Sequence, residues 1–292
     1  MTFNDKADIS RGKASKRGRN TGLAVGGGGL GLVVLFVISQ FLGVDITGLA
    51  DGGQAPAGPE SSLDQCLTGA DANENIDCRM KGAAASLDEY WAIEYTDLGG
   101  DYVSPQNLQL FSGATQTSCG SASSATGPFY CPPDETIYLD TSFYDELRGR
   151  YGSSGGPLAE MYVVAHEWGH HIQNISGTLE KAQDGKTGPD SNGVRVELQA
   201  DCFAGSWTAA ASKVEDTHGV AYLQPVTQAQ IEDALSAASA VGDDRIQQAA
   251  TGQVNPESWT HGSSEQRQRW FMTGYDQGAA FCDTFAVSGP EL

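Results

Sequence analysis

The feature that most constrains this chain is the run His166-Glu167-Trp168-Gly169-His170, which matches the pattern H-E-x-x-H. Residues at positions i and i+4 of a helix share one face, so both imidazoles could reach a single zinc ion. Glu167 would then be placed to act on a water molecule bound to that ion. Residues 157–175 carry apolar side chains at helical spacing and are followed by Gly177, which predicts a buried helix. The alternative is a pair of hydrogen-bonded core histidines without a metal.

A catalytic zinc ion takes three protein ligands and leaves one position open, so a third donor is needed. The extended pattern H-E-x-x-H-x-x-G-x-x-H is excluded, because Gln173 and Ser176 stand where it requires glycine and histidine. Residues 194–201 predict a second helix on which Glu197 and Asp201 share a face. We interpret Glu197 as the third ligand and Asp201 as a carboxylate that orients a ligand histidine. Alternatively, both are solvated acids of a surface helix.

Two further histidines lie close to predicted helices. His171 follows His170 but points about 100° away from it around the helix, so we interpret it as a supporting or structural residue. His261 precedes a capping box formed by Ser263 and Gln266, which predicts a helix start. From there His261, or alternatively Tyr275, could stabilise an oxyanion. Equally compatible with the sequence is that His261 only packs against the start of the helix.

Five segments together resemble a bacterial family of neutral zinc metallopeptidases: residues 137–140, 165–174, 197–202, 242–245 and 261–267. The similarity extends from about Tyr138 to the C-terminus. The resemblance implies a zincin-like fold, with His166, His170 and Glu197 as ligands of one catalytic Zn²⁺ and Glu167 as the general base. Members of this family also resemble this chain in having an N-terminal membrane anchor.

Charge is distributed unevenly along the chain. Residues 1–20 carry six basic and two acidic side chains; since the whole chain has net charge −20, the remainder carries −24. Residues 21–44 are uncharged and would span about 36 Å as a helix, enough for a bilayer core. We therefore predict a single-pass anchor in the cell membrane, with a cytoplasmic N-terminus and an extracytoplasmic domain. A cleaved signal peptide is the competing interpretation.

The six cysteines all follow the apolar run, which fits an oxidising compartment. Fifteen connectivities are possible. Pairing of neighbours along the chain predicts the disulfides Cys66–Cys78, Cys119–Cys131 and Cys202–Cys282. A cysteine metal site is disfavoured, because no C-x-x-C occurs.

The chain is thus divided into four parts: a basic cytoplasmic tail (1–20), a transmembrane anchor (21–44), a flexible linker (45–62) and an extracytoplasmic zinc metallopeptidase domain (63–292). For that domain we predict the α+β class, mainly helical with a small sheet. The β-rich run 136–140 is the candidate for a strand that pairs with extended substrate, although an ordinary core strand is equally compatible. The strong negative charge excludes nucleic-acid binding through phosphates.

The sequence therefore predicts a membrane-anchored, zinc-dependent endopeptidase that acts on peptide or protein substrates. One alternative is a catalytically silent, zinc-containing binding or scaffold module of the cell envelope. Glu167 disfavours it, because a structural zinc site needs no general base. The other alternative is a zinc amidase that acts on the cell wall.

Overall fold

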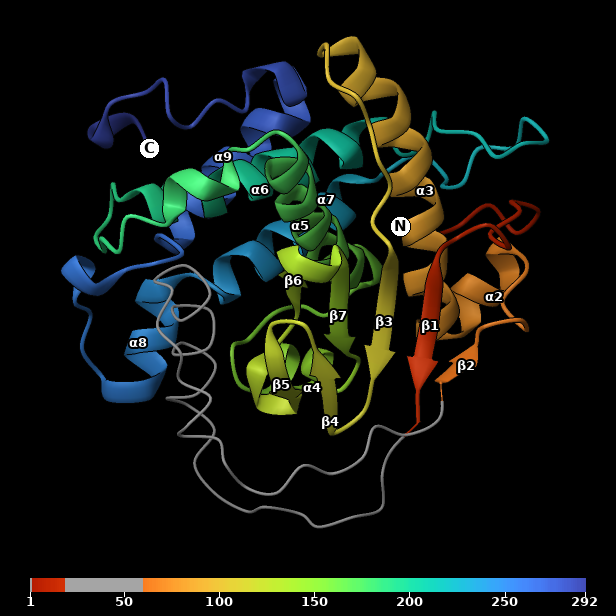
Figure 1. Ribbon diagram of the computed structural model, residues 1–292, viewed down its shortest axis with the longest axis horizontal. Helices are drawn as coiled ribbons and strands as arrows, with labels where there is room; N and C mark the ends of the chain where they lie inside the picture. Colours follow the sequence, from red (N-terminus) through yellow and green to blue (C-terminus); the bar gives the residue numbers. More distant parts are fainter. Residues whose placement is uncertain (1, 19–59) are drawn as a thin grey trace.

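The computed structural model describes residues 2–18 and 60–292, which form a mixed α and β fold (Figure 1). One five-stranded sheet has the order β2 (Glu60–Ser62), β1 (Ala14–Arg17), β3 (Asn107–Phe111), β7 (Thr136–Asp140) and β6 (Phe129–Cys131). Strand β3 runs parallel to both β1 and β7, whereas β2 and β6 are antiparallel strands at the two edges. A separate hairpin consists of β4 (Ala114–Thr117) and β5 (Gly120–Ser123).

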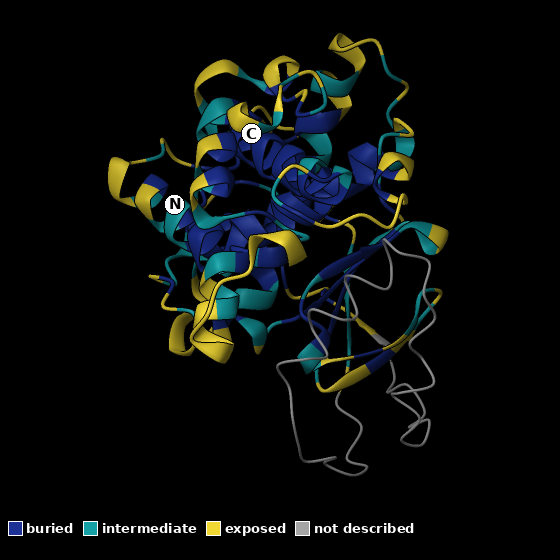
Figure 2. Cartoon of the chain, turned by 90° about the vertical axis from the view of Figure 1, so that its left-hand side faces the viewer, coloured by how far each residue is buried: buried dark blue, intermediate teal, exposed yellow. Residues whose placement is uncertain are grey.

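The remaining described chain contains eight α-helices: α2 (Gly69–Glu74), α3 (Ile76–Asp97), α4 (Phe143–Gly149), α5 (Pro157–Ile175), α6 (Asn192–Ala210), α7 (Gln228–Ala240), α8 (Asp243–Thr251) and α9 (Ser264–Gln277). Helix α5 packs against α3, α6 and α7, and α6 also packs against α9. Buried residues fill the interior of this helical part, and exposed residues lie on its outer turns (Figure 2). The α+β class predicted from the sequence is confirmed.

Helix α5 begins at Pro157, a residue suited to the first helical position because the missing N–H needs no partner there. Its apolar side chains surround the helix, and every residue from Leu158 to Gln173 is buried. Helix α6 starts behind Ser191, whose side chain accepts the backbone N–H of Val194. Both helices of the predicted metal site are therefore present, with the starts that their sequences indicate.

Glycines allow the central helices to approach each other closely. A Cβ atom added to Gly169 would lie 2.9 Å from Cα of Ala200, so α5 and α6 touch within the H-E-x-x-H run. At the crossing of α6 and α9, a Cβ on Gly205 would lie 1.9 Å from the carbonyl oxygen of Phe271. Larger residues would push these helices apart. The close approach of α6 sets where its acidic side chains lie relative to α5.

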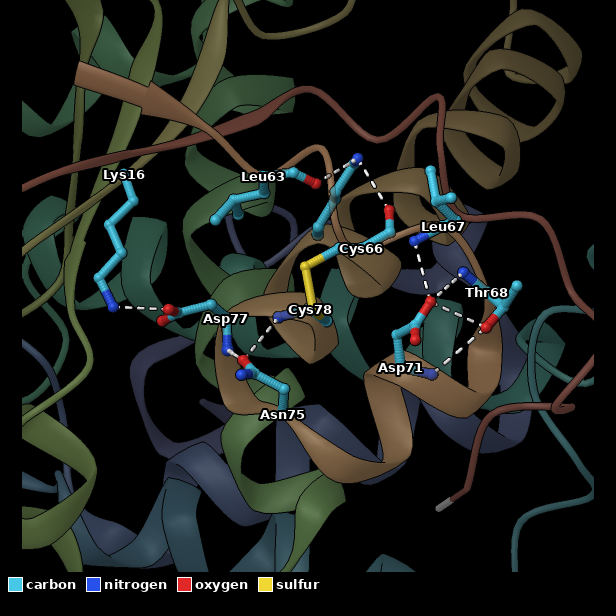
Figure 3. Close-up of a disulfide and its surroundings, with 10 residues drawn as sticks. Lys16, Leu63, Cys66, Leu67, Thr68, Asp71, Asn75, Asp77 and Cys78 are labelled. Atoms are coloured by element: carbon cyan, nitrogen blue, oxygen red, sulfur yellow. Dashed lines mark hydrogen bonds and ion pairs between the residues drawn. A yellow bond between two sulfur atoms is a disulfide. The ribbon is translucent and has the colours of Figure 1, made fainter.

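The N-terminal residues belong to the folded domain. Phe3 and Ile9 are fully buried, and the backbone N–H of Asn4 donates to the carbonyl of Tyr222. Strand β1 then joins the sheet beside β3. Figure 3 shows Lys16 of this strand paired with Asp77 at the start of α3, at 2.5 Å. Residues 2–18 therefore do not form the separate tail that was predicted for residues 1–20, because Phe3, Ala7 and Ile9 are buried in the core of the domain.

The predicted localisation is wrong as well. Strand β1 pairs with β2 so that Arg17 lies opposite Glu60. A chain that crossed a membrane once between these residues would leave them on opposite sides. In residues 2–18 and 60–292, no helix is long and apolar enough to cross a membrane. The apolar run 21–44 lies outside the described residues, as does the linker predicted at 45–62 up to the start of β2.

Three disulfides join the pairs expected from the sequence: Cys66–Cys78, Cys119–Cys131 and Cys202–Cys282. Cys66–Cys78 links the loop before α2 to the first turn of α3, next to the caps formed by Thr68 and Asn75 (Figure 3). Buried Lys81 donates to the carbonyls of Leu63 and Cys66 and so fixes the same loop. Cys202–Cys282 ties α6 to the segment that follows α9.

Candidate metal centre

His166 and His170 lie on one face of α5, one turn apart, as their spacing predicts. Their ring centroids are 4.8 Å apart, and both side chains are buried. Helix α6 brings Glu197 against them. The Nε2 atom of His166 lies 3.2 Å from Oε2 of Glu197, and that of His170 lies 3.5 Å from Oε1. One donor atom from each of the three residues falls within 4.8 Å of the others, so the cluster could hold a metal ion.

Asp201 lies one turn beyond Glu197 on α6 and contacts the outer side of His166. Its Oδ1 is 2.8 Å from Nδ1 of His166. An ionised carboxylate only accepts, so Nδ1 donates and Nε2 is left to face the cluster. Arg267 of α9 donates to both carboxylate oxygens of Asp201, at 2.8 and 3.0 Å, and balances this buried charge. Tyr162 also donates to Oδ1 of Asp201.

Gln173 holds the second histidine. Its Oε1 lies 2.8 Å from Nδ1 of His170, and its Nε2 donates to the carbonyl of Val196 on α6 at 2.7 Å. The amide therefore orients His170 and links the two helices at once. Sequence analysis used Gln173 only to exclude a longer motif. Gln173 follows His170 by three residues, so the two side chains are neighbours on the helix surface. This spacing could have identified Gln173 as a partner of His170.

Burial and charge act in opposite directions on the groups of the cluster. Burial raises the pKa of Glu167 above its ordinary value of 4.5. Burial alone would raise the pKa of Glu197 too, but His170 and His166 hold it well below its usual range. Burial would lower the pKa of His166, yet Asp201 beside it raises that pKa to about 9. Glu197 and Asp201 are therefore both carboxylates at neutral pH.

A hollow of about 170 Å³ opens beside the cluster. His166, His170, Glu197 and Glu167 all line it, so the residue between the two histidines faces the same space as the cluster. Other walls come from α4, the end of α7, α8 and the strand β6. Leu179 and Gln183, from the segment between α5 and α6, also line the hollow. This arrangement leaves room for a bound molecule next to the cluster.

His261 also lines this hollow, whereas the other candidate, Tyr275, does not. Asp243 at the start of α8 holds the His261 loop: one oxygen accepts the backbone N–H groups of Thr260, His261 and Gly262. The other lies 3.1 Å from Nδ1 of His261. Burial would lower the pKa of His261, but Asp243 raises it above 6.5. The contact of Asp243 with His261 was not expected from the sequence, because eighteen residues separate the two.

His171 lies on the other side of α5 and is fully buried. Its Nε2 donates to the carbonyl of Val103 at 2.6 Å, and its Nδ1 lies 3.0 Å from the hydroxyl of Tyr130. Asn174 also donates to this hydroxyl. His171 therefore connects α5 to β6, away from the cluster of His166, His170 and Glu197.

The prediction that residues 136–140 pair with extended substrate is wrong. Strand β7, at residues 136–140, forms as predicted but lies between β3 and β6, so both of its edges are occupied. Strand β6 is the edge strand, and Phe129 and Tyr130 of β6 line the hollow. The local pattern of residues 136–140 could not show this, because strand order depends on pairing with distant segments.

The fold and this site place the chain in the H-E-x-x-H class, with a carboxylate from a second helix beside the two histidines in a cluster that could hold a metal ion. The chain belongs to the family described as "Putative neutral zinc metallopeptidase", whose model matches residues 3–285. This match confirms the resemblance seen in the sequence and extends it to the N-terminal residues that enter the core.

Relatives of this family occur in distant bacteria. The chain is 50% identical over 258 residues to the uncharacterized protein Rv2575 of Mycobacterium tuberculosis, covering 86% of each chain. It has the same identity and coverage with the uncharacterized protein Mb2605 of Mycobacterium bovis. It is 38% identical over 286 residues to the uncharacterized protein YpfJ of Escherichia coli (strain K12), covering 96% of this chain and 94% of the relative. No solved structure matches the chain, so the zincin-like fold stays a prediction.

Proposed function

We propose that this protein is a zinc-dependent endopeptidase in which His166, His170 and Glu197 hold one Zn²⁺ and Glu167 is the general base. The observation that carries this proposal is the shared hollow: the three donor residues and Glu167 line the same space. A zinc ion with a purely structural role needs neither an open side nor a neighbouring base. Family membership supports the same reaction class.

The donor atoms lie near the spacing that a zinc ion needs. Zinc–nitrogen and zinc–oxygen bonds of 2.0–2.2 Å place neighbouring ligand atoms about 3.4 Å apart in a tetrahedron. The Nε2 atoms of His166 and His170 lie 3.2 and 3.5 Å from different oxygens of Glu197, and one donor atom from each residue lies within 4.8 Å of the others. Both histidines have Nδ1 engaged, by Asp201 and Gln173, so both present Nε2 to the same point. Three protein ligands would leave one position for water.

When bound, zinc would polarise the carbonyl of the scissile bond and make a water molecule easier to deprotonate. Glu167 would take a proton from the attacking water and deliver it to the leaving amine. Burial raises the pKa of Glu167, which makes its carboxylate a stronger base for the first step. His261, held by Asp243, would donate from Nε2 to the oxygen that becomes negative in the transition state.

Strand β6 would align the substrate. Its outer edge is not paired with another strand of the described sheet, and its residues border the hollow. An extended peptide that added to this edge would run past the cluster with its backbone groups hydrogen-bonded. The link from Tyr130 to His171 would keep the edge at a fixed distance from α5.

Zinc content and peptide cleavage, measured on the full chain with disulfides formed, test this proposal. We expect one zinc per chain in wild type and in Glu167→Gln, with cleavage of denatured protein and of a peptide library in wild type only. Full cleavage by Glu167→Gln would reject the assigned base. One zinc in both without any cleavage would favour the binding or scaffold module. Cleavage of cell-wall peptides but not of proteins would favour the amidase.

A further inference from the structure

We propose that the hollow selects peptides with a large apolar side chain, of the size of Leu or Phe, on a residue that flanks the cleaved bond. This inference rests on the proposed peptidase function and names its substrate class. It follows from the position, chemistry and size of one part of the hollow, which we call the apolar pocket: Phe143, Tyr151, Val163, Val241 and Ile246.

The apolar pocket begins next to the proposed base. Val163 precedes Glu167 by four residues on α5, so the two side chains lie on the same face. One helical turn advances about 5.4 Å along the axis. A side chain of four or five carbon atoms spans a similar length. A substrate whose scissile bond lies over Glu167 would therefore direct a neighbouring side chain over Val163.

Most charged groups of the hollow already have partners. Glu197 contacts His166 and His170, buried Arg267 donates to Asp201, and His261 lies against Asp243. The five residues of the apolar pocket carry no charge. A charged substrate side chain among them would lose its hydration without gaining a partner there, which is unfavourable.

The apolar pocket consists of surface that a ligand could cover. Phe143, Tyr151, Val241 and Ile246 are only partly buried, although each is apolar or aromatic, and the first three pack at the edge of the core. These four side chains come from α4, the residues after it, the end of α7 and α8, and they converge on α5. Covering them would remove apolar surface from water, which favours binding of an apolar group.

The volume of the hollow limits the apolar pocket to one large side chain. The whole hollow, of which the apolar pocket is one part, measures about 170 Å³. An apolar cavity of about 150 Å³ accepts one benzene molecule. Burying a Leu-sized side chain strengthens binding by about tenfold to a hundredfold relative to leaving it exposed. A substrate with a small residue at this position would lack this increase in binding strength.

Binding of N-acetyl amino acid hydroxamates to the zinc-loaded full chain tests the proposal without turnover. A hydroxamate chelates zinc and so holds the adjacent side chain beside the cluster. We expect the Leu derivative to bind about tenfold or more tightly than the Asn derivative, which has a similar size but is polar. Equal affinities, or tighter binding of the Asn derivative, would overturn the proposal.

Two variants, one inside and one outside the hollow, test whether the binding preference comes from the apolar pocket. Ile246→Lys should weaken binding of the Leu hydroxamate and strengthen binding of the Asp hydroxamate, whereas partial unfolding would weaken both. Ile93→Lys is the control, since Ile93 is 63% exposed on α3 and does not line the hollow. An unchanged ratio of Leu to Asp affinity in Ile246→Lys would contradict the assigned pocket.

Cleavage of the peptide library separates this inference from the proposed function. Apolar residues should be enriched on one side of the cleaved bonds. Tight binding of the Leu hydroxamate with no cleavage of any peptide would support the apolar pocket and reject the peptidase. Cleavage abolished in Glu167→Gln but without a preference for apolar residues would support the peptidase and reject the apolar pocket.

Discussion

Two buried carboxylates, Asp201 and Asp243, each hold a histidine at the candidate site from a different helix. Asp201 was expected from its spacing after Glu197, because both lie on one helix. Asp243 was not, because its contact with His261 depends on how α8 packs against the loop before α9. At the scale of single residues, the sequence therefore predicted partners within a helix but missed one formed between distant segments.

Asp243→Asn should change the pH profile of peptide cleavage. Asp243 raises the pKa of His261 above its ordinary value of 6.5, so His261 keeps its proton to a higher pH than an ordinary histidine and loses it as pH rises through that raised value. Asparagine would remove the largest effect that opposes burial and so lower this pKa. We expect the alkaline limb of kcat/KM to move to lower pH. Asp244→Asn is the control, because Asp244 accepts from Ser264 instead. An unmoved limb in Asp243→Asn would show that His261 does not act as a proton donor.

Asp201→Asn should weaken zinc binding by about tenfold to a hundredfold, because the outer partner of a ligand histidine fixes its orientation and basicity. The substitution also leaves Arg267 buried without a counter-charge, which should cost about 3–5 kcal/mol of stability. Competition with a chromogenic chelator measures the affinity, and urea unfolding measures the stability. Asp216→Asn, at a buried carboxylate far from the cluster, should reduce stability without changing zinc affinity.

At the scale of elements, local patterns predicted α5, the start of α6 and the strand β7 in their observed places. Helical spacing, a first-turn proline and a serine cap are properties of a few neighbouring residues, so they can be recognised directly. Sheet order could not be recognised in this way. Strand β7 occupies the interior because β1, from the N-terminus, extends the sheet on one side and β6 closes it on the other.

Gly169→Ala should separate α5 from α6 at the cluster. The new methyl group would lie 2.9 Å from Cα of Ala200, a backbone atom that cannot move alone. Glu197 would then withdraw from the histidines, and zinc affinity and cleavage should both fall.

The matched control is Gly149→Ala in α4, where nothing lies within 4 Å of the added atom. It should be neutral or stabilise by up to about 1 kcal/mol, since alanine favours helix. Zinc titration and thermal unfolding of both variants compare the two sites, and unchanged zinc affinity in Gly169→Ala would contradict this account.

At the scale of the whole molecule, charge and hydropathy misled the prediction. A basic stretch before an apolar run is typical of a membrane anchor, and that pattern concealed Phe3, Ala7 and Ile9 among charged residues. Isolated apolar residues in a short segment give little periodicity, so their burial becomes visible only in the folded structure.

Phe3→Ala should destabilise the protein by about 3–5 kcal/mol, as expected for a large aromatic side chain removed from a core. Deletion of residues 2–18 should prevent stable folding, because it also removes β1 from the sheet. Urea unfolding measures the first effect, and circular dichroism the second. Lys6→Ala, at an exposed position, should leave stability within about 0.5 kcal/mol of wild type. A folded deletion variant with native zinc affinity would contradict this role of the N-terminus.

Strands β1 and β2 pair with Arg17 opposite Glu60. The N-terminal segment therefore binds to the rest of the domain much as a covalently attached peptide ligand would. Phe3 and Ile9 are its buried anchors, and Lys16 supplies an ion pair to Asp77. A covalent connection raises the effective concentration of such a segment. If the chain were cut between Arg17 and Glu60, the N-terminal peptide should stay docked at high protein concentration and dissociate on dilution. The two pieces, expressed separately and mixed, should then reassemble into one folded protein.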